Sequence, residues 1–435
     1  MLVSNRIIVI DDNRDDLNAI CNIFHKNGIG CRGFEYDPFS LPNEPLTGIR
    51  FVFIDMNLNP AGGGDIKSSL KDAIKHFISV ENGPYILIFW TNRVEEIDDF
   101  INFINRDDDD VKLKLKPLHI THIDKNEFID SEDHLTDKIN TILSDDFVKC
   151  IIQFDESALN AATKTLNAIL STINVSDKWG EQAEFDNACR LVFSKIAEST
   201  SGLTQAKLNP DLALKESLAS IFKHVLCQNQ DDYWREYLTP LQTAEKSNDI
   251  SFPDAFSLEK LNSIYHIDTS RIEQKSIKDR GAVCKFSQQD KSVVFNDLFH
   301  TEYQLWLNES FHKLSTVNSA EIELVAVEFS AACDFSQNKD RTNKYILGVL
   351  ISSIHGKKLR NTRLKDQIFL MPFDFHYENQ NYTLALNLNY TFNLPKQPNV
   401  LSGPLFILSK ETMDMLGLEY SSHLSRIGIT SFRKK

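Results

Sequence analysis

The sequence lacks the features that mark several common classes of protein. Its seven cysteines include no Cys-x-x-Cys pair and their number is odd, which argues against a zinc knuckle and a disulfide framework. No apolar run approaches the ~20 residues that span a bilayer. The N-terminus, MLVSNRIIVIDD, contains no signal-peptide core. We therefore expect a cytoplasmic protein that makes no contact with membranes.

The chain also has too little basic charge for a typical duplex-binding protein. Its 435 residues include 47 Lys and Arg against 61 Asp and Glu, a formal net charge of −14. A protein that binds duplex DNA needs a basic face for the phosphates, so no duplex DNA partner is expected. No helix-turn-helix with a basic recognition helix follows residue 150. The sequence contains no Walker loop, Gly-x-Ser-x-Gly or kinase motif either.

Residues 1–148 alternate short apolar runs with amphipathic stretches. The runs are continuous, as expected for parallel strands that are buried on both faces, and they cover residues 6–10, 51–54 and 86–90. Helical spacing of apolar residues covers 15–26, 65–80 and 94–105. Strands that alternate with helices predict a doubly wound α/β domain with a parallel sheet.

The remaining residues predict two further domains of different character. Residues 149–275 carry almost no strand signal, and helices are predicted over 156–173, 182–198, 210–227 and 256–265. Residues 276–435 predict a β-rich α+β domain or a small barrel, with strands over 322–329, 345–351, 367–371, 382–388 and 404–408.

Acidic and hydroxyl side chains follow the predicted strands of the first domain. Asp11 and Asp12 follow the first run, Asp55 follows the second, and Thr91 follows the third. The carboxyl ends of adjacent parallel strands meet at one crevice, where such folds bind ligands. Three acids in that crevice would repel one another unless a cation lay between them, and a set of oxygen ligands suits Mg²⁺. The sequence therefore predicts a magnesium site.

These residues resemble the receiver domain of two-component response regulators, over about a third of the chain. The family has an acidic pair after the first strand, matched by Asp11 and Asp12, and a phosphate-accepting aspartate after the third, matched by Asp55, 43 residues beyond Asp12. Thr91 matches the hydroxyl residue after the fourth strand. The resemblance implies a five-stranded flavodoxin-like fold with Asp55 as phosphoacceptor. It also implies that Asp11, Asp12, Asp55 and the backbone carbonyl of Asn57 bind Mg²⁺.

The resemblance further implies a lysine at the end of the fifth strand, in contact with the phosphoryl group. Two lysines are candidates. Lys116 stands in a Lys-Pro pair 25 residues beyond Thr91, close to the usual receiver distance. Lys125 follows the strand-like run 118–124 and would make 112–117 an insertion. Both alternatives are open at the level of sequence.

A receiver joined to a long output region without DNA-binding signatures resembles the regulators of Detocs-type anti-phage phosphorelays. This resemblance implies a sensor histidine kinase and a second receiver-containing effector protein as partners, with the present chain relaying or buffering the phosphoryl group. The alternative is a receiver-gated effector whose C-terminal domain acts on nucleic acid or nucleotides. Its site would include Cys333, Asp334 and Lys339, which can equally be structural turn residues. Apart from receiver chemistry, the sequence indicates no enzymatic activity.

Overall fold

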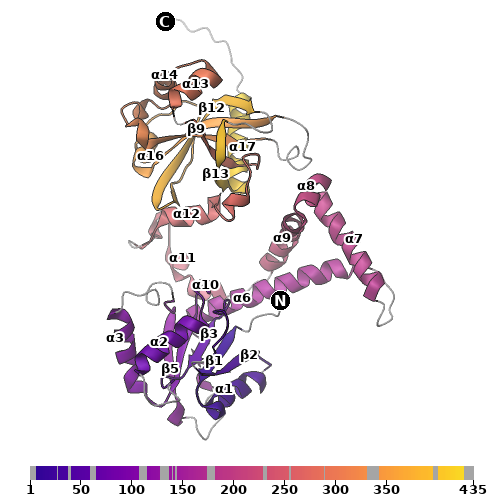
Figure 1. Ribbon diagram of the computed structural model, residues 1–435, viewed down its shortest axis with the longest axis vertical. Coiled ribbons are helices and arrows are strands. Elements are labelled where there is room, and N and C mark those ends of the chain that lie inside the picture. Colours follow the sequence, from indigo (N-terminus) through magenta and orange to yellow (C-terminus); the bar gives the residue numbers. More distant parts are fainter. Residues whose placement is uncertain are drawn as a thin grey trace. The chain divides into compact units, whose positions relative to one another are not determined.

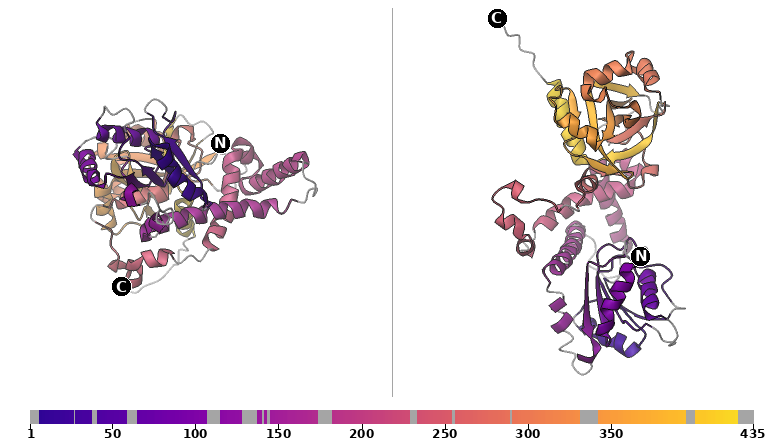
Figure 2. Two further views of the ribbon diagram at one scale, coloured as in Figure 1. Left: turned by 90° about the horizontal axis from the view of Figure 1, so that it is seen from below. Right: turned by 90° about the vertical axis from the view of Figure 1, so that its left-hand side faces the viewer.

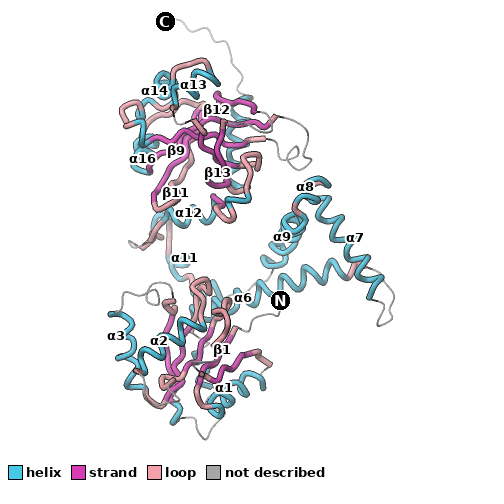
Figure 3. Tube along the Cα trace, in the orientation of Figure 1, coloured by secondary structure: helices cyan, strands magenta, loops and turns pink. Residues whose placement is uncertain are grey.

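A computed structural model of the chain shows an N-terminal α/β domain, a helical middle region and a C-terminal strand-rich domain (Figures 1 and 3). Two compact units are present: Met1–Glu156 with Asp231–Thr239, and Ser157–Gln230 with Pro240–Lys435. The structure describes residues 6–26, 28–37, 41–58, 65–106, 115–127, 137–139, 141–142, 145–173, 182–228, 233–253, 256–288, 290–330, 342–394 and 400–425.

The N-terminal domain is built on a five-stranded sheet in which every pair of strands is parallel. The strand order β2-β1-β3-β4-β5 is that of flavodoxin-like folds, so the predicted doubly wound fold class is confirmed. The strands are β1 (Ile7–Asp11), β2 (Cys31–Glu35), β3 (Phe51–Ile54), β4 (Ile86–Thr91) and β5 (His119–Asp124).

Helices cover both faces of this sheet. Alternate strand residues such as Val9 and Phe53 pack against α1 (Arg14–Lys26) and the start of α6 (Asp146–Leu170). The residues between them pack against α2 (Ile66–Phe77) and α3 (Ile97–Arg106), which follows a 3₁₀ turn. Burial on both faces explains why the central strands are continuous apolar runs.

Helix α6 begins at Asp146, so the predicted start at residue 156 is wrong by ten residues. Its first turns are covered on two sides, by the sheet through Val148 and by α10 (Tyr233–Tyr237). The Cys150 thiol donates a hydrogen bond to the Tyr233 carbonyl at 3.5 Å. This double coverage removes the one-sided apolar pattern by which amphipathic helices are recognised.

Asp155 fixes α6 to the N-terminal domain. Its carboxylate accepts a hydrogen bond from Arg50 Nε at 2.8 Å and also pairs with the Arg6 guanidinium. Both arginines flank strands of the sheet, Arg6 before β1 and Arg50 before β3. The unit boundary falls one residue further on, so the chain leaves the domain within this helix.

The described residues between 145 and 266 form helices joined by turns and loops, and no strand is assigned among them (Figures 1 and 2). Helices α7 and α9 are neighbours, and the Ser217 hydroxyl of α9 donates to the Ile196 carbonyl of α7 at 3.4 Å. In the part of the chain that the structure describes, no helix is long and apolar enough to cross a membrane. The helices are α7 (Gln182–Ser201), α8 (Leu203–Leu208), α9 (Pro210–Gln228), α11 (Thr239–Thr243) and α12 (Leu258–His266).

The C-terminal domain contains an antiparallel sheet in the order β10-β12-β9-β8-β7-β13-β6, with β11 paired to β12. The predicted α+β class is confirmed. The barrel alternative finds no support among the described residues, because the strands at the two ends of this path, β10 and β6, are not paired there. The strands are β6 (Ile267–Asp268), β7 (Ala282–Phe286), β8 (Ile322–Glu328), β9 (Asn343–Ser352), β10 (Ile368–Leu370), β11 (Phe375–Tyr377), β12 (Gln380–Leu394) and β13 (Leu401–Leu408).

Both faces of this second sheet are also buried. One face packs against α13 (Lys291–Phe299), α14 (Tyr303–Ser310) and α16 (Ser353–Arg360), and the other against α17 (Lys410–Leu424). Helix α16 approaches β12 closely at Gly356, where an added Cβ would overlap the Thr383 side chain. Glycine at this position is therefore required by the packing.

Candidate functional site

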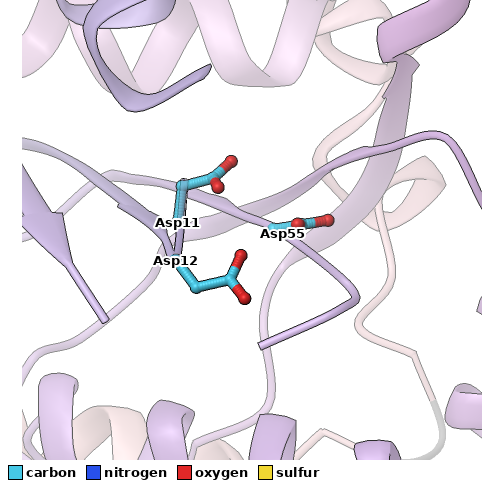
Figure 4. A group of neighbouring side chains, drawn as sticks. All are labelled: Asp11, Asp12 and Asp55. Atoms are coloured by element: carbon cyan, nitrogen blue, oxygen red, sulfur yellow. The ribbon is translucent and has the colours of Figure 1, made fainter. Parts of the chain in front are cut away.

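Three carboxylates lie together at the carboxyl ends of β1 and β3 (Figure 4). Asp11 is the last residue of β1, Asp12 follows it, and Asp55 comes directly after β3. One oxygen from each lies within 4.8 Å of the others. The parallel pairing of β1 with β3 produces this proximity. The pairing continues by one hydrogen bond beyond β3, because the Asp55 amide donates to the Ile10 carbonyl at 3.0 Å.

Asp55 is nearly buried, with 6% of its surface exposed. Its Oδ2 atom lies 3.1 Å from Nζ of Lys125. Its Oδ1 atom is buried and has no hydrogen-bond partner among the described residues. A buried carboxylate oxygen without a partner is costly, and it is also an available ligand or nucleophile.

Asp11 is fully buried. Its Oδ1 accepts a hydrogen bond from the Asn13 amide at 2.8 Å, and its Oδ2 accepts one from Lys125 Nζ at 2.8 Å. Burial raises the pKa of the Asp11 carboxyl from 3.8 to about 6, although the hydrogen bond and charge of Lys125 oppose this shift. The fraction of Asp11 in the carboxylate form therefore changes when positive charge nearby is lost or gained.

Lys125 follows β5 and neutralises part of this acidic cluster. Besides Asp11 and Asp55 it contacts Asp16 of α1, with Nζ 2.8 Å from Oδ2. Burial lowers the pKa of Lys125, but the charges of Asp55 and Asp11 and the bonds to Asp11 and Asp16 outweigh it, so the pKa is raised overall. Sequence reasoning missed Asp16, whose only local signal is the acidic first turn of α1.

The two lysine candidates occupy different ends of β5. The register pairs Thr91 of β4 with Asp124, so Lys125 lies at the carboxyl end, beside the acids. Lys116 precedes the strand, is exposed, and lines an apolar cavity with Phe100 and Ile104 of α3. The structure therefore brings Lys125 to the acids and leaves Lys116 at the opposite end of the strand.

The other predicted residues are placed as follows. Thr91 ends β4 and is fully buried; its hydroxyl accepts a hydrogen bond from the Arg93 amide at 3.0 Å, which leaves the hydroxyl proton available for donation. Asn57 stands two residues after Asp55, half-buried between two buried residues. The predicted output residues Cys333, Asp334 and Lys339 lie outside the described residues.

The cluster fits a divalent cation. Asp11, Asp16 and Asp55 each contact the ammonium group of Lys125, so these three acids outnumber the positive charge that they share, and a divalent cation would bring the local charge closer to neutrality. The clustered ligand atoms are carboxylate oxygens, and the further candidate, the Asn57 carbonyl, is also an oxygen, the ligand type that hard cations prefer. The unpartnered Oδ1 of Asp55 supplies an acceptor that such a cation would satisfy.

No model of a protein family, no curated protein and no solved structure matches this chain. The class of the N-terminal domain is therefore defined by its own features. The five-stranded parallel sheet and the acidic cluster at its carboxyl edge are compatible with a receiver-like domain that could hold a divalent metal.

Proposed function

We propose that the protein is a response regulator that accepts a phosphoryl group on Asp55. The observation that carries this proposal is the Asp55 carboxylate, which clusters with two acids, pairs with Lys125 through one oxygen and has a second buried oxygen without a partner among the described residues. A nucleophile for phosphoryl transfer needs such an oxygen, together with positive charge to accept the developing negative charge of the phosphoryl group.

The residues divide the chemistry between them. Asp11, Asp12, Asp55 and the carbonyl of Asn57 would hold Mg²⁺, which supplies charge neutralisation for the phosphoryl oxygens. An Asp55 oxygen attacks the phosphorus in line, the bond from phosphorus to the donor atom breaks, and a mixed anhydride forms. Lys125 pairs with a phosphoryl oxygen, and the Thr91 hydroxyl donates to another.

In the cell the donor would be a sensor histidine kinase, and the chain would relay or buffer the phosphoryl group, with a second receiver-containing effector as its counterpart. A place in a bacterial stress or anti-phage phosphorelay rests only on the resemblance of domain organisation. Helix α6 is anchored to the N-terminal domain by Asp155 and continues past the end of that domain. A structural change at the phosphoryl site would therefore be transmitted to the following residues through this helix.

Intact-mass measurement of the full chain with acetyl phosphate and Mg²⁺ tests the proposal. Wild type is expected to gain about 80 Da, the mass of one phosphoryl group, and Asp55→Asn to gain nothing. Asp124→Asn is the matched control, because Asp124 ends β5 at the same edge of the sheet but is not among the three clustered acids. Labelling that persists in Asp55→Asn, or in wild type with a chelator, would overturn the proposal.

A polar cavity of the C-terminal domain favours a second candidate function, the binding of a nucleotide by a receiver-gated effector. The cavity holds about 550 Å³ and is lined by Lys313, His355 and Lys358 among others. His355 pairs with Glu321 at 3.1 Å through Nε2, and its buried Nδ1 has no partner among the described residues. Titration calorimetry with ATP tests this function: binding should weaken in Lys358→Ala and not in the exposed control Lys365→Ala. Absence of binding to wild type excludes it.

A further inference from the structure

Two cysteines and a histidine lie together where α1 meets the edge strand β2. Cys21 belongs to α1, Cys31 begins β2, and His25 stands in the last turn of α1. The Cys31 thiol donates to the Cys21 carbonyl at 3.8 Å and lies 3.6 Å from Nε2 of His25. Neither cysteine is in a disulfide.

Close packing of α1 on β2 brings the Cys31 thiol to the backbone of Cys21. Gly33 of β2 faces α1, and an added Cβ there would lie only 3.1 Å from Sγ of Cys21. Each cysteine is 8% exposed, whereas His25 is exposed. The pair is thus at the margin of the core, with its histidine open to solvent.

The pair is better suited to redox chemistry than to metal binding. Among the described residues, the only group of three or more His, Cys, Asp or Glu with ligand atoms all within 4.8 Å is the acidic cluster. The Cys31 thiol donates its proton to the Cys21 carbonyl, a bond that holds this proton on Cys31. We therefore assign Cys21 as the thiol that reacts first, because the thiolate is the nucleophile.

We propose that Cys21 and Cys31 are a modification site, at which a hydroperoxide converts the two thiols to a reversible disulfide. The Cys21 thiolate attacks a peroxide oxygen, the O–O bond breaks, and a sulfenic acid forms while the departing hydroxide takes up the proton that the Cys21 thiol released, which gives one water. Cys31 sulfur then attacks Cys21 sulfur as His25 takes the Cys31 proton; the S–O bond breaks, and the departing hydroxide takes this proton from His25 and leaves as a second water. Two thiols are oxidised while one hydrogen peroxide is reduced to two waters, and a dithiol reverses the reaction.

The disulfide would join α1 to β2 covalently. Helix α1 also carries Asp16, which contacts Lys125 at the acidic cluster, so the linkage would restrain one wall of the proposed phosphoryl site. The disulfide itself does not depend on phosphorylation. It should therefore form equally in Asp55→Asn, which separates this inference from the proposed function.

The test is peptide mapping of the reduced full chain after treatment with one equivalent of hydrogen peroxide and alkylation. Trypsin cuts after Lys26, between the two cysteines, so their peptides stay together only if a disulfide links them. We expect a linked pair about 2 Da lighter than the two free peptides, lost on treatment with dithiothreitol. The exposed thiol of Cys227 is the internal control and should remain alkylatable.

Two variants test the assigned roles. Cys31→Ala should stop at the sulfenic acid of Cys21, detectable by trapping with dimedone. His25→Gln, at an exposed position, should slow disulfide formation at least about threefold, and His76→Gln in the last turn of α2 is the matched control. Oxidation of Cys227 without a linked pair would overturn the proposal, and an unchanged rate in His25→Gln would remove His25 from it.

Discussion

Replacement of Lys125 by methionine is expected to destabilise the N-terminal domain in a way that Mg²⁺ partly reverses. The lysine side chain is 9% exposed and the carboxylates of Asp11 and Asp55 are 0% and 8% exposed, so all three charges are nearly buried. Methionine has a similar length and an apolar side chain in place of the lysine stem, and it removes the ammonium group, which lies 5.9 Å from the centre of the Trp90 ring. The substitution therefore removes mainly the charge.

The magnitude follows from the burial. Removal of one partner of a buried ion pair costs about 3–5 kcal/mol. Part of this cost is avoided because Asp11, whose pKa burial already raises to about 6, can take up a proton when Lys125 is absent. We expect a net loss of about 3 kcal/mol at neutral pH without metal.

Hydrogen exchange of the full chain measures this loss in the domain concerned. Amides of β1, β3 and β4 should exchange roughly a hundredfold faster in Lys125→Met, since each 1.4 kcal/mol is about tenfold. Mg²⁺ should reduce the difference in exchange rate between Lys125→Met and wild type, because a cation bound by the acids replaces the missing positive charge. Lys116→Met, at an exposed position, should differ from wild type by less than about 0.5 kcal/mol.

Two results would refute this reasoning. If exchange in Lys125→Met stays within about threefold of wild type, the acids are neutralised by something other than Lys125. If Mg²⁺ slows exchange in the wild type but leaves the difference between wild type and Lys125→Met unchanged, the cation does not replace the charge of Lys125 among the acids.

Three further predictions concern other parts of the chain. Burial raises the pKa of Asp11 to about 6. The stabilisation of the fold by the protonated Asp11 carboxyl is therefore complete below the pKa of the unfolded chain and is lost as the pH rises through about 6. Mg²⁺ binds the carboxylate form, so calorimetry should find Mg²⁺ binding about tenfold weaker at about pH 5 than at about pH 7.5. Gly356→Ala should lower the free energy of unfolding by about 2–3 kcal/mol in a denaturant titration, while Gly417→Ala, in a helix with nothing within 4 Å of the new Cβ, should raise it by about 0.5–1 kcal/mol. Asp155→Asn should lower the local stability of the first half of α6 by about 1 kcal/mol and so speed its hydrogen exchange. The exposed neighbour is the control, and Glu156→Gln should leave the exchange unchanged. Equal effects of the two substitutions would show that the arginine contacts do not anchor the helix.

The sequence predicted the features that depend on strand order alone. Asp11 and Asp55 meet because adjacent parallel strands end at one edge, and continuous apolar runs reveal such strands when both faces are buried. The edge strand β2 gave no such run, because only Cys31 of its five residues is buried. Its place could be inferred only from the spacing between Asp12 and Asp55.

The features that the sequence did not predict depend on contacts between distant residues. Asp16 acquires its role from Lys125, which lies 109 residues away along the chain. The early start of α6 depends likewise on α10, a segment that returns to the N-terminal unit after the middle helices. Neither contact leaves a local periodicity, so pattern reasoning has nothing to detect.

The position of Lys125 has a consequence for how the protein responds to magnesium supply. An ammonium group already sits among the acids, so a newly synthesised chain carries its own counter-ion and can complete its N-terminal sheet before any metal arrives. Under the function proposed here, magnesium starvation should then silence phosphoryl transfer while the amount of protein in the cell stays constant. Under the same proposal, restoring the ion would recover signalling at once, without new synthesis.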